Sequence, residues 1–204
     1  MPIHLMIGSG RNNLNVNKRK FFMTSKEISV APREIHDLIQ RASRVKGCEA
    51  SVAERIASKI TFCEINYGGG INSWLQLVAD DENCLTETFK SVQVLDSIPS
   101  KDSLDFSWNP SIPFAFIAQS LNALQSYGFT WECNPEAPTG DVQIECVCLN
   151  KLDSEKIASN NKMNKAFSEG LQVDKDEWEN LVGISSRFLL SEKILDDADS
   201  AVYE

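Results

Sequence analysis

The chain has 204 residues, of which 42% are hydrophobic and 24% charged, a composition that excludes a disulfide-stapled miniprotein and a wholly disordered chain. Its formal net charge is −9, and a negative field disfavours broad binding to the phosphate backbone of nucleic acids. The one basic run, at residues 18–20, is only three residues long. We therefore expect no nucleic-acid partner.

The sequence also argues against secretion and membrane insertion. No apolar run approaches the roughly 20 residues that a bilayer-spanning helix needs, and residues 1–20 lack the apolar segment and cleavage site of a secretion signal. The six cysteines are then expected to stay reduced. These features predict a cytoplasmic protein with no membrane partner.

The first 23 residues differ in composition from the rest, because they are rich in asparagine and basic residues and show no helical stripe. Two interpretations stay open, a disordered leader or an overlong translated start with Met23 as the true one. We expect a single domain over residues 24–190 and an acidic tail over residues 191–204.

Apolar residues at steps of three and four predict two helices after the leader. The first starts near Pro32 and stops at Gly47, and a capping box of Ser51 and Glu54 opens the second. Its short link to the first predicts an antiparallel pair. The two stripes are Ile35, Leu38, Ile39, Ala42 and Val45, then Val52, Ile56, Ile60, Cys63 and Tyr67.

The glycines at 68–70 end the second helix, and a short helix is expected over residues 71–78. Residues 80–110 are mixed, with a loop from residue 97 to residue 110. A strongly apolar helix over residues 114–124 is expected to be central to the core.

Two strands follow, over residues 129–133 and 142–149, and the turn residues between them favour a hairpin. Residues 153–170 read as a polar surface helix, and residues 174–177 open a last helix. The predicted fold class is α+β, with several helices packed on a small, largely antiparallel sheet.

The cysteines suggest a metal site and the glycines a phosphate-binding loop, but neither motif is complete in the sequence. Cys146 and Cys148 would share one strand face, and a hairpin could bring Cys133 close, but a structural zinc site generally needs four ligands. The triple glycine follows a helix rather than a strand, so a helix stop is favoured over a phosphate-binding loop. We expect no metal and no cofactor.

Catalytic signals are also weak. His36 is expected on the solvent-exposed side of its helix, and the carboxylates near the hairpin are expected at solvated positions. The sequence contains no nucleophile-elbow motif with a serine. Whether the protein is an enzyme stays open. Should it hold a ligand, the expected polar residues are Glu54, Glu64 and Arg187, the last because a guanidinium among carboxylates can bind an anion.

Four segments of the chain carry a resemblance, namely residues 41–47, residues 53–59, the glycine turn at 68–70 and residues 178–199. They resemble an uncharacterised bacterial family, domain of unknown function 3726. The resemblance spans residues 24–199. Arg55 and Ile56 stand where the family has Glu-Ala, and its small-residue segment near the end is largely absent here. The resemblance implies no activity.

Two functions follow as hypotheses. The first is an accessory or partner-binding domain of bacterial metabolism, because catalytic and cofactor motifs are missing. The alternative is a small-molecule-binding enzyme with a polar pocket between helices and sheet.

Overall fold

The computed structural model describes residues 26–80, 84–97, 102–136, 139–152 and 162–200, with the backbone alone beyond residue 188. The predicted leader, including Met23, lies outside the described residues, as does much of the predicted surface helix. The described chain consists of helices and two small antiparallel sheets. The predicted α+β class is therefore confirmed.

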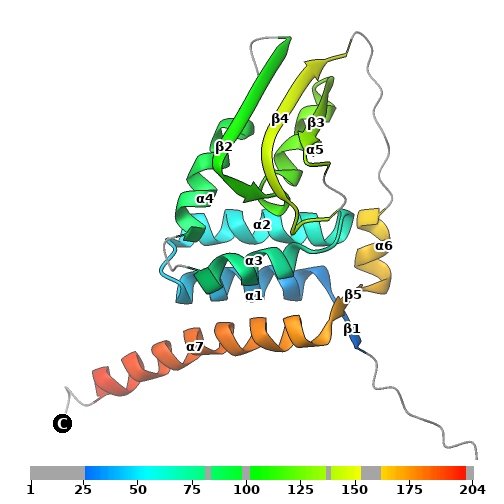
Figure 1. Ribbon diagram of the computed structural model, residues 1–204. Coiled ribbons are helices and arrows are strands. Elements are labelled where there is room, and N and C mark those ends of the chain that lie inside the picture. Colours follow the sequence, from blue (N-terminus) through cyan, green and yellow to red (C-terminus); the bar gives the residue numbers. More distant parts are fainter. Residues whose placement is uncertain (1–25, 81–83, 98–101, 137–138, 153–161, 201–204) are drawn as a thin grey trace, which may run out of the picture.

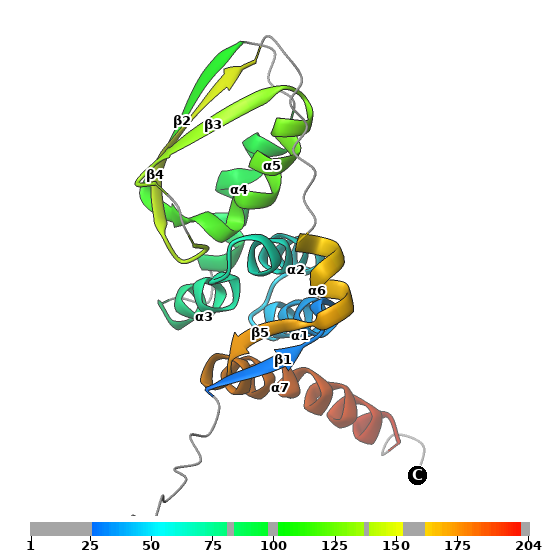
Figure 2. The same ribbon diagram turned by 90° about the vertical axis from the view of Figure 1, so that its right-hand side faces the viewer.

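The lower layer in Figure 1 is built from helices near both ends of the chain. Helices α1 (Pro32–Val45) and α2 (Ala50–Asn66) form the expected antiparallel pair, and α3 (Gly70–Asp80) packs beside α2. Helix α1 lies between α2 and the long helix α7 (Lys175–Ser200), as Figures 1 and 2 both show. Helix α7 continues into the stretch that the sequence assigned to an acidic tail.

A two-stranded sheet joins the two ends of the described chain. Strand β1 (Glu27–Val30) pairs antiparallel with β5 (Leu171–Asp174), and Val30 lies opposite Leu171. Helix α6 (Lys162–Glu169) precedes β5 and covers the end of α2, where the Lys162 amine donates 2.7 Å to the Asn66 carbonyl. A cation is well placed there, because the end of a helix carries partial negative charge.

The middle of the chain forms the upper layer. Its antiparallel sheet has the order β2-β4-β3 and lies over α4 and α5 (Figure 2). The predicted hairpin is confirmed, since Cys133 in β3 lies opposite Val147 in β4. The elements in chain order are α4 (Cys84–Val92), η1 (Gln93–Asp96), β2 (Ser103–Pro113), η2 (Phe114–Phe116), α5 (Ala118–Ser126), β3 (Phe129–Asn134) and β4 (Gln143–Lys151).

Three local predictions were wrong. The loop expected over residues 97–110 is largely strand β2, because its apolar residues alternate at every second position and face the core. The helix expected over residues 114–124 is divided at Ile117 into η2 and α5. Helix α2 begins at Ala50 without a side-chain cap, so the capping box of Ser51 and Glu54 does not form.

Helix α2 is central to the packing, since it contacts α1, α3, α5 and α6. The middle of its predicted apolar stripe, Ile56, Ile60 and Cys63, is fully buried, and the two ends of the stripe are partly buried. Beside it, the indole N–H of buried Trp74 donates 3.0 Å to the Ser43 hydroxyl. Within the described part of the chain, no helix has both the length and the apolarity to cross a bilayer.

Candidate functional site

A lysine lies within the buried stripe of α2. Lys59 is three residues after Ile56 and four before Cys63, so the helix turns it inward with them. Its side chain is only 4% exposed. A buried ammonium group is costly unless it is paired and hydrogen-bonded, so its partners decide whether this position is stable.

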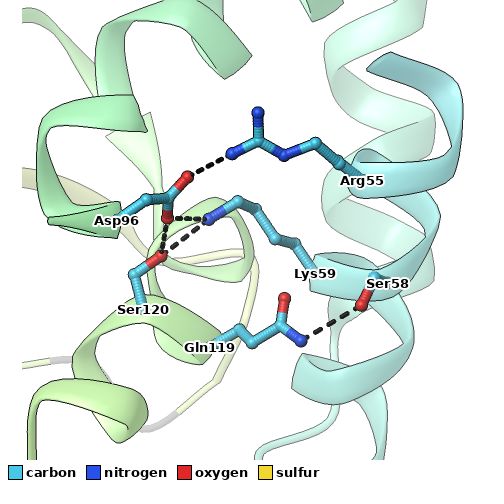
Figure 3. Close-up of polar contacts among 6 residues, drawn as sticks. All are labelled: Arg55, Ser58, Lys59, Asp96, Gln119 and Ser120. Carbon is cyan, nitrogen blue, oxygen red and sulfur yellow. Dashed lines mark hydrogen bonds and ion pairs between the residues drawn. The ribbon is translucent and has the colours of Figure 1, made fainter. Parts of the chain in front are cut away.

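Lys59 meets one carboxylate and one hydroxyl (Figure 3). Its Nζ lies 2.9 Å from Asp96 Oδ1, at the end of η1, and 2.6 Å from Ser120 Oγ in α5. The Ser120 hydroxyl in turn donates to Asp96 Oδ1 over 2.6 Å. The three groups form a closed ring that ties α2 to the upper layer.

Arg55, one turn before Lys59, adds a second cation. Its Nη2 lies 2.6 Å from Asp96 Oδ2, and its guanidinium sits 4.8 Å from the centre of the buried Phe89 ring. We call Arg55, Lys59, Asp96 and Ser120 the lysine cluster. Next to it, the Gln119 amide donates 3.1 Å to the Ser58 hydroxyl (Figure 3).

Two members of the lysine cluster, Lys59 and Asp96, have shifted pKa values. Burial lowers the pKa of Lys59, and the hydrogen bond and charge of Asp96 offset this only in part. Burial alone would raise the pKa of Asp96, but the hydrogen bonds from Ser120 and Lys59 and the nearby positive charges lower it below its usual value. Asp96 is thus held ionised between two cations.

The lysine cluster lines a pocket of about 370 Å³ between α2, η1 and α5. Arg55, Lys59 and Asp96 are its charged lining residues, and Leu95 and Leu124 belong to its apolar wall. The remaining lining residues are Ser58, Ser97, Gln119, Ser120, Ala123 and Tyr127. The alternative hypothesis placed a pocket between helices and sheet, whereas this one lies among helical segments.

A second group of charges, partly buried, lies near the end of α2, where Glu64 accepts a 3.0 Å hydrogen bond from the Ile71 N–H at the start of α3. Burial raises the pKa of Glu64, against hydrogen bonds from the Ile71 and Gly70 backbone. Burial and the charges of Glu64, Asp174 and Asp141 raise the pKa of Glu177 to about 7. We call Glu64, Asp141 and Glu177 the acidic cluster.

Glycines allow the backbone to pack closely against its neighbours around the acidic cluster. A Cβ on Gly69 would lie 2.9 Å from Asp141 Oδ1, and one on Gly140 would lie 2.7 Å from the Cys63 sulfur. The glycine turn is thus a tightly packed helix stop, as the sequence indicated. The Gly70 and Ile71 N–H groups after this turn bond the Glu64 carboxylate.

The three predicted ligand residues lie in different places. Glu54 is exposed on α2, where it accepts 2.6 Å from the Gln40 amide, and Glu64 belongs to the acidic cluster. Arg187 is exposed on α7, on the other side of α1 from α2 (Figure 1). None of the three lines the pocket at the lysine cluster.

The cysteines of the hairpin do not converge. Cys133 is opposite Val147 and therefore points to the core side of the sheet, whereas Cys146 and Cys148 share the other face. Across the described ranges, no group of three or more histidine, cysteine or acidic side chains is placed to hold a metal ion.

The lysine cluster was not predicted from the sequence, although part of its signal was present. Lys59 interrupts an apolar stripe, and Ser120 lies between Ile117 and Leu124 on the buried face of α5. A polar residue on a core face is unusual and marks a paired group. Nothing in the sequence around Asp96 identified it as the partner.

No family model, no curated protein and no solved structure matches this chain.

Proposed function

We propose that this protein binds a small organic anion in the pocket at the lysine cluster. The observation that carries the proposal is the charge of the pocket wall, where Arg55 and Lys59 face one carboxylate, Asp96. This wall keeps one net positive charge in a chain whose net charge is −9. An anionic ligand would complete the neutralisation.

Both cations have donors left for such a ligand. A protonated lysine amine carries three N–H groups, and Asp96 and Ser120 accept two from Lys59. Arg55 carries five N–H groups, and its one ion-pair contact to Asp96 is through Nη2. A carboxylate or a phosphate could accept the remaining donors.

The size and lining of the pocket limit the ligand. A volume of about 370 Å³ is at the small end of ligand pockets, which run from roughly 300 to 1,000 Å³. Leu95, Ala123 and Leu124 offer an apolar wall, and Tyr127 lies at the edge with 57% exposure. We therefore propose a compact ligand with one anionic end and a short apolar part.

The experiment is a calorimetric and thermal-shift titration with small carboxylates, small phosphate esters and their uncharged amide or alcohol analogues. Arg55→Gln is expected to weaken anion binding by at least about tenfold, since a hydrogen bond to a charged group contributes roughly 1.5–3 kcal/mol. Arg41→Gln, the same charge change at an exposed site on α1, is the matched control. Equal binding by the two variants, or no preference for anions, would contradict the proposal.

The accessory, partner-binding function predicted from the sequence has less support. Large exposed apolar side chains among the described residues lie on separate segments, namely Val94, Tyr127, Leu152, Phe167 and Val182. A docking face would gather such side chains into one patch. A stable partner recovered with the native protein, lost on changing one of these residues, would favour that function instead.

A further inference from the structure

We propose that the anion bound by the lysine cluster is a small 2-oxo acid and that Lys59 forms an imine with its carbonyl carbon. This inference rests on the proposed anion-binding function and names the chemical class of the ligand. It follows from the position of one buried amine between a carboxylate, a hydroxyl and a guanidinium.

The spacing of the two cations matches the two functional groups of an oxo acid. Arg55 and Lys59 are four residues apart on α2, so their side chains start about 6 Å apart on one helix face. A guanidinium is suited to a carboxylate, which it binds through two parallel hydrogen bonds. With the carboxylate at Arg55, the adjacent carbonyl is directed towards the Lys59 amine.

Lys59 has the surroundings that imine formation needs. It is 4% exposed, so the reacting amine is withdrawn from bulk water. Asp96 lies 2.9 Å from its Nζ and can take and return a proton, and Ser120, at 2.6 Å, links the two. Burial also lowers the pKa of Lys59, which increases the fraction of reactive free amine relative to a surface lysine.

The step balances with water as its only other product. The Lys59 ammonium gives one proton to Asp96, and the free amine attacks the carbonyl carbon to form the C–N bond. A second proton moves from nitrogen to the former carbonyl oxygen, giving a neutral carbinolamine. Asp96 then returns its proton to the hydroxyl group, the C–O bond breaks, water leaves, and a protonated imine remains on Lys59. Nothing is oxidised or reduced.

The test is reductive trapping on the full chain. The protein is incubated with glyoxylate, pyruvate or 2-oxobutyrate, sodium borohydride is added to reduce any imine to a stable amine, and the modified lysines are mapped by peptide mass spectrometry. We expect at least about tenfold more adduct on Lys59 than on any surface lysine, because the pocket raises the effective concentration of the reacting pair. Lys90 and Lys175, both exposed, are internal controls.

The outcomes separate this inference from the proposed function. L-lactate, the matching 2-hydroxy acid, is titrated alongside, because it can bind the pocket but cannot form an imine. Binding of both anions with adduct absent from Lys59, or spread evenly over surface lysines, would overturn the imine and leave the anion pocket standing. Failure of every anion to bind would overturn both. Lys59→Arg keeps the charge but removes the reactive amine, and is expected to abolish the adduct; if it does not fold, the map of the native chain decides alone.

Discussion

Two groups of charges lie about five residues apart along α2, one around Lys59 and one around Glu64, and burial affects their charges in opposite ways. In the lysine cluster, two cations enclose one carboxylate, so all three charges are kept and a polar pocket remains beside them. In the acidic cluster, burial first and neighbouring carboxylates second raise the pKa values of Glu64 and Glu177. Opposite charges thus keep the lysine cluster charged, whereas burial among other carboxylates favours the protonated forms of Glu64 and Glu177.

The largest expected effect comes from removing the shared carboxylate of the lysine cluster. Asp96→Asn leaves Lys59 and Arg55 without a counter-charge and is expected to lower the free energy of unfolding by about 2–3 kcal/mol, measured by urea denaturation. This is less than the roughly 3–5 kcal/mol for breaking a buried ion pair, because the Asp96 side chain is 27% exposed.

Asp102→Asn is the control for that change, since its carboxylate is 86% exposed and its contact with Lys151 is a surface pair. We expect it to change stability by less than about 0.5 kcal/mol. Equal losses in the two variants would mean that Asp96 does not compensate buried charge.

The next largest effect is expected from Gly140→Ala, which tests how tightly the chain is packed beside the acidic cluster. Gly140→Ala would put a Cβ 2.7 Å from the Cys63 sulfur and 2.9 Å from the Gly68 carbonyl oxygen. We expect a loss of about 2 kcal/mol from overpacking, seen as a lower denaturation midpoint. Gly183→Ala, in α7 with no atom within 4 Å of the new Cβ, is expected instead to stabilise by up to about 1 kcal/mol.

The pH dependence distinguishes the two clusters directly. Glu177 has a pKa of about 7 in the folded state and an ordinary value of 4.5, so the folded state binds more protons between these pH values and stability falls as pH rises through them. Glu177→Gln is expected to remove about 1 kcal/mol of this fall between pH 5 and pH 8, a figure reduced for partial exposure.

Glu179→Gln is the control on the same helix, where its carboxylate is 64% exposed and pairs with Lys175. Its stability profile between pH 5 and pH 8 should follow that of the native protein. If both variants keep the native slope, the acidic cluster does not produce the pH dependence.

The smallest effect concerns the hydroxyl of the lysine cluster. Ser120→Ala removes one acceptor from Lys59 and one donor to Asp96, and a loss of about 1 kcal/mol is expected on denaturation. Ser126→Ala, exposed in the same helix, should be neutral or slightly stabilising. A neutral Ser120→Ala would show that the Lys59–Asp96 pair alone maintains the cluster.

The sequence predicted the parts of the fold that follow from local periodicity. The stripe of α1, the end of that helix at Gly47 and the β3–β4 hairpin are such features, since each depends on residues close in the chain. Strand β2 was missed because the polar and proline residues near Asn109 are typical of a loop, and its pairing with β4 shifts register at this point.

The candidate site was not predictable to the same extent, because it joins residues distant in sequence. Lys59 and Ser120 are 61 positions apart, and Asp96 lies between them in a short helical turn. Lys59 and Ser120 are marked as polar residues on core faces, but their partners are not, because only the packing of α5 and η1 against α2 brings the three residues together. Glu54 is on α2 and Arg187 on α7, and these two helices lie on opposite sides of α1 (Figure 1).

The most direct test of the anion pocket is a two-dimensional ¹H–¹⁵N NMR titration of the native protein with pyruvate and, separately, L-lactate. We expect saturable shifts of the backbone amides of Ser58, Ser97, Gln119 and Ser120, with small changes at the acidic cluster. Absence of saturable shifts at these four amides, or shifts centred on the residues around Glu64, would contradict the anion pocket.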